Sequence, residues 1–545
     1  MDKGGDPGLT FDLPEEMPQG PSEEETPIRD GEDLGFGSDS LVIEEAPSDY
    51  SDDFRTWELF GDEDILDTTA AVVQTSRSLR NDWEPFNSQE ELRNPQVTRH
   101  LEFYPHDPTG TQIDSLYQCF KWQEDLSRDL RVQMVYIENK HYYIFEPTHL
   151  KSGEGLKIVI PANIKFSDHL LNTVDIQEFD EMYSEFYLDN NSSLADKCGG
   201  KIFEERNGRE LEIALPNPWR KKAQGKIIQH VPITLYSDDT LGNSSQQWNK
   251  HISFYFTLAG LHPHLTNQEY HCHFLGVIFH YLLLCKPIVA EMNELATDGH
   301  FAYDSLLKQD VLIMSVIMAF IAESPMHAEI TSTSLPANAN SPCRVCLLFV
   351  AKKVDKSLKG YVTDFMGLSD GLRQPRPRNW EETKTRLHQA WRDSKNKAKT
   401  SYDEETKKFG LKDNINVEFV EKYHQRNKPG QKEAINKIEK DPFHRLFSPF
   451  LNLKGFDGAK DTPVEILHGF QLGIIRYLLR DFMSGLTDGN KRTLESHWRA
   501  FNTDSLNIPP LQALFMVNHY KSFIGKHTKK VIQAAPRSYG APCVY

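Results

Sequence analysis

Residues 233–258, which read ITLYSDDTLGNSSQQWNKHISFYFTL, constrain the fold more than any other segment of the chain. A short apolar run at their start leads directly into two adjacent acids, Asp238 and Asp239, and the residues LGNSS that follow are typical of turns. The returning run HISFYFTL is rich in β-branched and aromatic residues, which favour strands. The segment therefore predicts two paired strands, with carboxylates at the tip of the first.

These acids permit two interpretations. Carboxylates held at a strand end suit Mg²⁺ or Mn²⁺, which prefer hard oxygen ligands, but Asp, Gly, Asn and Ser are also the ordinary composition of a hairpin loop. A second apolar run, VLIMSVIMAFIA at residues 311–322, ends in Glu323, and Pro325 then prevents its continuation. If Asp238 or Asp239 converges with Glu323, the pair could hold the cations of a two-metal site. The alternative is that Glu323 starts an exposed loop.

The net charge of −18 is concentrated at the N-terminus. Residues 1–67 hold 22 acidic and three basic residues, whereas the rest of the chain holds 57 acidic and 58 basic residues. The acidic segment has few large apolar side chains with which to offset the entropy of ordering, so we expect most of it to be disordered. Its apolar positions around Trp57 could fold onto a partner, and a solvated tail is the alternative.

Basic charge gathers in residues 373–399, where nine basic residues face three acidic ones. Such density suits contact with the phosphates of DNA, which would place the protein in the nucleus. Trp380 and Trp391 could stack on bases or dock the helix, and a solvated amphipathic helix is the alternative. The candidate nucleic-acid-binding residues are Arg373, Arg376, Arg378, Lys384, Arg386, Arg392 and Lys395.

The seven cysteines are an odd number for so long a chain, which argues against a disulfide framework. Cys343 and Cys346 form a CxxC pair, which supplies two of the four ligands that a structural Zn²⁺ needs. Glu465 with His468, one helical turn apart, or the cluster at residues 271–273 could complete the set. Two ordinary buried thiols are the alternative.

Several classes of protein are disfavoured. No apolar run reaches the ~20 residues that span a bilayer, and the N-terminus has no apolar signal segment, so we expect an intracellular protein without a membrane partner. P-loop, Rossmann, hydrolase-elbow and zincin motifs are absent from the sequence. Residues 464–486 (VEILHGFQLGIIRYLLRDFMSGL) have apolar side chains at helical spacing, which predicts a core helix. The sequence does not fix an oligomeric state.

Three segments together resemble transposase-derived proteins of basidiomycete fungi, related to the Plavaka and Kyakuja-Dileera-Zisupton elements. They are ITLYSDDTLGNSSQQWNKHISFYFTLAGL, AESPMHAEITSTSLPANANSPCRVC and LKGFDGAKDTPVEILHGFQLGIIRYLLRDF, and the resemblance covers residues 97–536. It implies a ribonuclease H-like core with a Mg²⁺-binding acidic triad of the DDE type, interrupted by an insert bearing a CxxC. By that resemblance Asp238 or Asp239 is the first acid and Glu323 the second, and the Cys343–Cys346 pair belongs to the insert.

The chain departs from this family pattern in three places. Relatives read DSPMHAE where this chain reads ESPMHAE, so the second acid, Glu323, is one methylene longer. Residues 273–292 replace a polar helical segment, and the third acid, expected in a segment resembling TExxExFN, does not occur before Tyr545. We therefore expect a truncated, inactive remnant of a Mg²⁺-dependent enzyme for DNA nicking and strand transfer. A non-catalytic interaction protein is the alternative.

The expected fold is mixed α/β, with an incomplete ribonuclease H-like core, a helical insert and a disordered acidic N-terminus. The expected parts are an acidic tail (1–67), an N-terminal α+β region (68–229), the first part of the core (230–335), a basic helical insert with the CxxC (336–440), a helical region (441–535) and an atypical C-terminal tail (536–545).

Overall fold

A computed structural model describes residues 88–105, 119, 121–137, 139–150, 216–241, 250–266, 268–278, 281–335, 339–366, 375–425, 429–439, 446–503 and 510–538, with short strand segments between 156 and 214. The described residues form a mixed α/β fold, as predicted. The predicted acidic tail, the candidate DNA-binding residue Arg373 and residues 539–545 lie outside the described residues.

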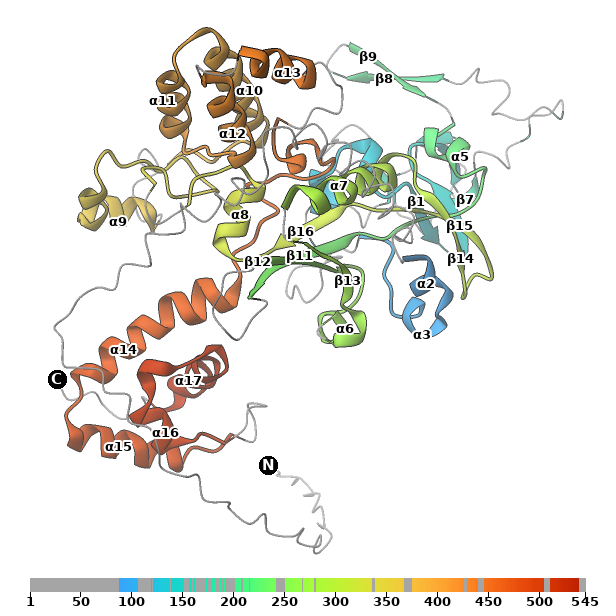
Figure 1. Cartoon of the computed structure of the whole chain (residues 1–545). Helices are drawn as coiled ribbons and strands as arrows, with labels where there is room; N and C mark the ends of the chain where they lie inside the picture. Colours follow the sequence, from blue (N-terminus) through green and yellow to red (C-terminus); the bar gives the residue numbers. More distant parts are fainter. Residues whose placement is uncertain are drawn as a thin grey trace, which may run out of the picture. The chain divides into compact units, whose positions relative to one another are not determined.

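The central sheet has four strands in the order β13-β12-β11-β16 (Figure 1). Its strands are β11 (Ile233–Leu241), β12 (Lys250–Leu258), β13 (His273–Ile278) and β16 (Ile317–Ile321). β11 and β12 pair antiparallel from Ile233 opposite Leu258 to Leu241 opposite Lys250. The predicted strand pair is therefore confirmed, but β11 continues through Asp238 and Asp239 to Leu241, so these acids lie within the strand and not at its tip. β13 continues antiparallel to β12, whereas β16 runs parallel to β11 on its other side.

Buried aromatic side chains hold this sheet together. Phe254 of β12 packs edge-on against Phe320 of β16, with ring centroids 6.4 Å apart, and both side chains are fully buried. Helix α7 (Tyr281–Thr297) adds Ile288 and Met292 to the same core. Because aromatic pairs in this geometry add stability beyond their burial, they fix how β11, which lies between β12 and β16, sits in the sheet.

The apolar run at residues 311–322 divides between two sheets. Its first part is β15 (Gln309–Met314), which lies between β10 (Ile228–His230) and β14 (His300–Asp304) in a three-stranded sheet. Its second part is β16, which joins the central sheet. The run is thus two strands, each buried. Its apolar pattern alone is compatible with either a buried strand or a buried helix. Near-continuous apolar character is what parallel strands covered on both faces require.

Residues 266–307, whose sequence pattern predicts an interrupted helical region, contain two strands. β13 and β14 flank α7 within them. β13 includes Phe274, which is 57% exposed and contacts Tyr255 of β12 at a ring-centroid distance of 5.4 Å. Pairing with β12 therefore decides the conformation of β13, even though the local sequence pattern favours a helix.

The insert is helical, as expected. Its helices are α9 (Lys359–Phe365), α10 (Trp380–Asn396), α11 (Lys399–Phe409), α12 (Asn414–His424) and α13 (Pro429–Glu439). Asn379 caps α10 by accepting from the N–H of Glu382, and Gly410 ends α11 in the left-handed conformation. Trp391 and Tyr402 are buried in the same apolar core as the central sheet.

The segment predicted as a core helix is helical but exposed along one side, so its predicted burial is wrong. It begins as a π-helix (Ile466–Ile475) and continues as α14 (Arg476–Gly485). Ile474 and Leu478 are 54% and 61% exposed. The buried side is a different one, because Leu479 and Met483 pack into a small separate core with α15 (Asp488–Arg499), α16 (Ala513–Asn518) and α17 (Gly525–Ser538).

Residues 132–150 (VQMVYIENKHYYIFEPTHL) alternate in a way that predicts a hairpin, with its turn near residues 138–140. This prediction is confirmed, because β1 (Met134–Ile137) pairs with β2 (Lys140–Tyr143) and Asn139 has a positive φ in the turn. The other elements are α2 (Ser88–Arg93), α3 (Pro95–Thr98), β3 (Pro147–Leu150), β4 (Leu156–Ile158), β5 (Ile160–Pro161), β6 (Thr173–Val174), β7 (Phe179–Met182), β8 (Lys201–Arg206), β9 (Arg209–Ala214), α5 (Pro218–Lys222), α6 (Pro263–Thr266) and α8 (Ser324–Ile330). Among the described helices, none has the length and apolar character to cross a bilayer.

Candidate functional site

Two predicted acids lie at the same edge of the central sheet. In the parallel pair of β11 and β16, Tyr236 is the partner of Ile321. Asp238 and Glu323 each follow two residues later. Neighbouring strands are about 4.8 Å apart, so two residues lying the same number of positions beyond a strand partner pair come close together. This places Asp238 next to Glu323. The side chain of Asp239 lies outside the described set, and its backbone pairs with Ile252.

Tyr236 reports how closely the acids gather. Burial is the main cause that raises the pKa of its phenol far above the usual value, and Asp238, Glu465 and Glu323 raise it further. The phenol hydroxyl also hydrogen-bonds the carboxylate of Asp238. Three carboxylates from three separate segments therefore act electrostatically on one tyrosine, which stays protonated and donates to Asp238.

The corner between β16 and α8 presents Glu323. Pro325 stands in the first turn of α8, where its missing N–H costs nothing. The backbone N–H of His327 donates to the carbonyl of Glu323 at 2.9 Å, and its ring Nε2 lies 3.0 Å from the carbonyl of Phe320. Burial lowers the pKa of His327 to about 4, so the ring is neutral at pH 7. His327 therefore holds the corner through two contacts, one with Phe320 before Glu323 and one with Glu323 itself.

Glu465 joins the site from a distant part of the chain. It caps the π-helix by accepting from the N–H groups of Leu467 at 2.6 Å and of His468 at 2.5 Å. The imidazole of His468 then spans two carboxylates, with Nδ1 3.0 Å from Glu465 and Nε2 2.9 Å from Glu323. The sequence analysis paired Glu465 and His468 with the cysteines and missed this role. The only sequence signal for it is their ExxH spacing.

The segment before Glu465 is fixed by contacts from three directions. The carbonyl of Asp461 accepts from Phe320 N–H at 2.7 Å, alongside β16. Lys121 forms an ion pair of 2.6 Å with the Asp461 carboxylate and donates to the carbonyl of Ile317 at 2.5 Å. Arg344 donates to the carbonyl of Thr462 at 2.8 Å. Since Thr462 is three residues before Glu465, these contacts set where the third carboxylate lies.

The cysteine pair does not form one ligand set with Glu465 and His468 among the described residues. Sγ of Cys343 accepts from the N–H groups of Val345 and Cys346 at 3.4 and 3.3 Å. A hydrogen bond from the Cys346 thiol, with these N–H groups and Arg378, lowers the pKa of Cys343 to about 5. Within the described residues, no group of three or more His, Cys, Asp or Glu could hold a metal ion, so the predicted zinc set is not assembled.

The alternative zinc cluster at residues 271–273 is also divided. His271 is buried and Cys272 is exposed. His273 lies 3.6 Å from Glu91 and stacks on Phe256. Burial lowers the pKa of both histidines. Their side chains serve the packing of β13 against its neighbours.

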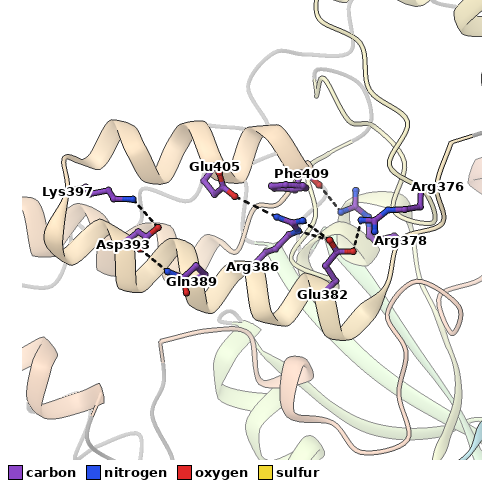
Figure 2. A network of polar contacts seen from close by, with 9 residues as sticks. All are labelled: Arg376, Arg378, Glu382, Arg386, Gln389, Asp393, Lys397, Glu405 and Phe409. Carbon is purple, nitrogen blue, oxygen red and sulfur yellow. Dashed lines mark hydrogen bonds and ion pairs between the residues drawn. The ribbon is translucent and has the colours of Figure 1, made fainter.

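Described bases of the basic segment are engaged by contacts within the chain (Figure 2). The carboxylate of Glu382 forms ion pairs with Arg376 at 2.6 Å and with Arg386 at 2.7 Å. The Arg386 guanidinium also lies 3.3 Å from the centroid of the Phe409 ring. Arg378 is buried and donates to the carbonyls of Phe409 and Cys343. These contacts tie α10 to α11 and to the CxxC loop.

The remaining candidate bases also have partners in the chain. Lys384 pairs with Glu381 at 2.8 Å, and Lys395 pairs with Glu439 at 2.5 Å. Arg392 donates to Gln389 at 3.0 Å. Trp380 and Trp391 are 4% and 2% exposed, so their rings dock α10 and do not offer a stacking surface.

Comparison with known proteins adds no name to this site. No protein-family model and no curated protein matches the chain. The site is therefore interpreted from its own residues.

Proposed function

We propose that this chain derives from a DDE-type DNA transposase, and that Asp238, Glu323 and Glu465 are the remnant of its metal site. The observation that carries the proposal is the gathering of these three carboxylates around Tyr236 and His468. Acids from three separate segments rarely share one surface without a positive charge to hold, because like charges repel.

The order of the strands supports a ribonuclease H-like core. Such a core begins with three antiparallel strands, followed by a strand that runs parallel to the first, and the order β13-β12-β11-β16 has this form. Asp461 then lies beside the other edge of β16, where its carbonyl accepts from the N–H of Phe320, and the chain reaches Glu465 at a helix start. In this proposal Glu465 takes the position of the third acid, for which the sequence offered no candidate.

The three carboxylates carry the hard oxygen ligands that Mg²⁺ and Mn²⁺ prefer, but among the described residues they are not arranged as a group that could hold an ion, which agrees with a remnant of a metal site. When bound, such ions activate a water or a 3′-hydroxyl and stabilise the leaving oxygen of a phosphodiester. The chain itself supplies the positioning. Tyr236 orients Asp238, and the His327 corner orients Glu323.

Two features argue that the remaining activity is low. Glu465 is committed to its helix cap and to His468, so a cation must displace these hydrogen bonds before it gains that ligand. Loss of a cap costs about 1 kcal/mol. Glu323 reaches about 1 Å further than the aspartate of relatives, in a type of site where such displacement is costly. We therefore infer residual metal binding without DNA nicking or strand transfer by this chain alone.

Titration of the full chain with Mn²⁺, followed by the spectroscopic signal of the free ion, tests the proposal. The double variant Asp238→Asn with Asp239→Asn and the single variant Glu465→Gln should each weaken Mn²⁺ binding at least tenfold. Glu269→Gln changes an exposed acid that follows β12 along the chain. It is the matched control and should bind Mn²⁺ like the parent. Equal binding by all four proteins would remove the site.

A scaffold function is the second candidate, and the exposed apolar side of the helix at residues 466–482 favours it. In that case the acids are retained only for their hydrogen bonds, and the chain serves to bind other molecules. Contact with DNA through the basic segment stays a prediction, and it would place the protein in the nucleus. If it occurs, log affinity should fall linearly with log salt. An absence of binding at low salt contradicts it.

A further inference from the structure

A row of large apolar side chains runs along the outer side of the helix formed by the π-helix Ile466–Ile475 and α14. Ile466, Phe470, Ile474 and Leu478 are 67%, 43%, 54% and 61% exposed, and Phe482, at 38%, continues the row. We call these five residues the apolar ridge. Exposed apolar surface of this extent on one element marks an interaction site more often than scattered apolar residues do.

The change of helix type keeps the ridge straight. In an α-helix of 3.6 residues per turn, a step of four residues overshoots one turn, so a row at this spacing drifts around the helix. A π-helix has more residues per turn, so the same step falls short of one turn. The drift from Ile466 to Ile474 therefore opposes the drift from Ile474 to Phe482. The apolar ridge therefore stays on one side of the helix.

Contacts on the other sides fix the ridge toward the outside. Leu467 and Gln471 lie against the start of α17, where a Cβ on Gly525 would come within 2.1 Å of the Leu467 side chain. Leu479 and Met483 are held in the C-terminal core. Rotation of the helix about its axis cannot hide the ridge without breaking these contacts. The exposure is thus a property of the packing of this helix.

We propose that the apolar ridge is the contact surface for a second copy of this chain, with the two helices antiparallel about a two-fold axis at Ile474. The ridge is symmetric in sequence, since its apolar positions lie four and eight residues to each side of Ile474. An antiparallel pair thus places Phe470 opposite Leu478 of its partner and Ile466 opposite Phe482. A two-fold interface requires this self-complementarity.

The exposed area of the apolar ridge and the charges beside it are both compatible with an antiparallel second copy of the chain. Together with Tyr477, which is 66% exposed, the ridge presents about 600 Å² per copy, or about 1,200 Å² in the pair, the lower limit for a specific dimer. Rows of residues at four-residue spacing also interdigitate readily between two helices. A parallel pair would set the exposed Asp481 against its own copy, whereas an antiparallel pair separates the two carboxylates by about 20 Å.

Sedimentation velocity of the full chain between 1 and 100 µM, as chosen concentrations, tests dimer formation. The parent should show a reversible monomer–dimer equilibrium, and Ile474→Arg should raise the dimer dissociation constant more than about tenfold, because it sets two charges together on the axis. Leu306→Arg, at a position 50% exposed in the turn between β14 and β15, is the matched control and should behave like the parent. A parent that stays monomeric overturns the proposal, as does a dimer that Ile474→Arg leaves intact.

Disulfide trapping tests the orientation. After mild oxidation, a mixture of the Phe470→Cys chain and the Leu478→Cys chain should form a disulfide between these two positions, identified by peptide mass. Phe470→Cys alone should not link to itself through that position. Self-linkage of Phe470→Cys would show a parallel pair and overturn the antiparallel arrangement. Binding of the monomer to lipid vesicles or to another protein, with the same loss in Ile474→Arg and no self-association, would assign the ridge to a different occupant.

Discussion

The corner that presents Glu323 should weaken in acid, because its histidine is buried and neutral. His327 is 1% exposed, and burial lowers its pKa to about 4 from 6.5. Arg344 lowers this pKa further, whereas the hydrogen bond with Phe320 and the charge of Glu465 act in the opposite direction. The perturbation is the variant His327→Gln. It can keep a donor near the position of Nε2, and it removes the titration.

The magnitude follows from the two pKa values. The folded-state pKa is the lower one, so the folded chain binds fewer protons than the unfolded chain between pH 6.5 and pH 4. The stability contribution is therefore fully present above pH 6.5, and it is lost as the pH falls through this window. Between pH 7 and pH 5 the loss is about 1.8 kcal/mol, which corresponds to about a 20-fold rise in the open population.

Native-state hydrogen exchange measures this opening locally. The reporter amides are Phe320, which donates to Asp461, and Thr331, which donates to His327. In the parent, the opening free energy at both amides should fall between pH 7 and pH 5, and in His327→Gln the fall should be smaller by about 1.8 kcal/mol. His497→Gln, at an exposed histidine of α15, is the control and should follow the parent. An equal pH dependence in the parent and in His327→Gln would refute the reasoning.

Three other changes test the surroundings of the site. Arg344→Ala removes the donor to Thr462 and should weaken Mn²⁺ binding about tenfold, through misplacement of the third carboxylate, with the fold retained by circular dichroism. Gly410→Ala, at a φ of 62° and with a Cβ 2.5 Å from that of Ser341, should lower the free energy of unfolding by about 1–3 kcal/mol, whereas Gly430→Ala, which meets nothing within 4 Å, should raise it by about 0.5 kcal/mol. Glu382→Gln frees the two arginines that it binds, so any DNA affinity should rise at low salt and its salt dependence should steepen.

Local signals were sufficient for the central hairpin. The β-branched and aromatic residues of β11 and β12 favour strands, and the turn residues between them favour a reversal of the chain, so the local preferences agree with the observed pairing. The position of Glu323 at the end of a buried strand was also predictable, because Pro325 stops the strand and suits the start of a helix. What the sequence left open was whether the strands that carry Asp238 and Glu323 are neighbours. That depends on a parallel pairing across 75 intervening residues, for which short-range patterns carry no information.

The errors have a common physical cause. The spacing of Ile466, Phe470 and Ile474 shows that one side of a helix is apolar, but it does not show what covers that side. In the same way, the chemistry of Glu465 and His468 suits a metal with either thiols or carboxylates as co-ligands. Tertiary contacts decide both questions. In this chain, Lys121 and Arg344 fix the segment before Glu465 beside β16, and so place Glu465 and His468 next to Glu323 instead of the cysteines.

If the acidic cluster derives from a metal site, as proposed, its hydrogen bonds explain how it can persist once metal binding is lost. Three carboxylates without a cation between them would repel one another and weaken the fold. Here Tyr236 is a partner for Asp238, and the ring of His468 lies between Glu323 and Glu465, to both of which it can donate only when both ring nitrogens carry hydrogen. In this proposal, the contacts that stabilise the metal-free chain are separate from the contacts to a metal ion. It follows that His468→Ala should destabilise the metal-free chain and yet bind Mn²⁺ at least as tightly as the parent, because the cation no longer competes with the imidazole. A variant that loses both stability and Mn²⁺ affinity would instead show that His468 supports the metal-bound arrangement, and the site would have to be regarded as one still organised for its ion.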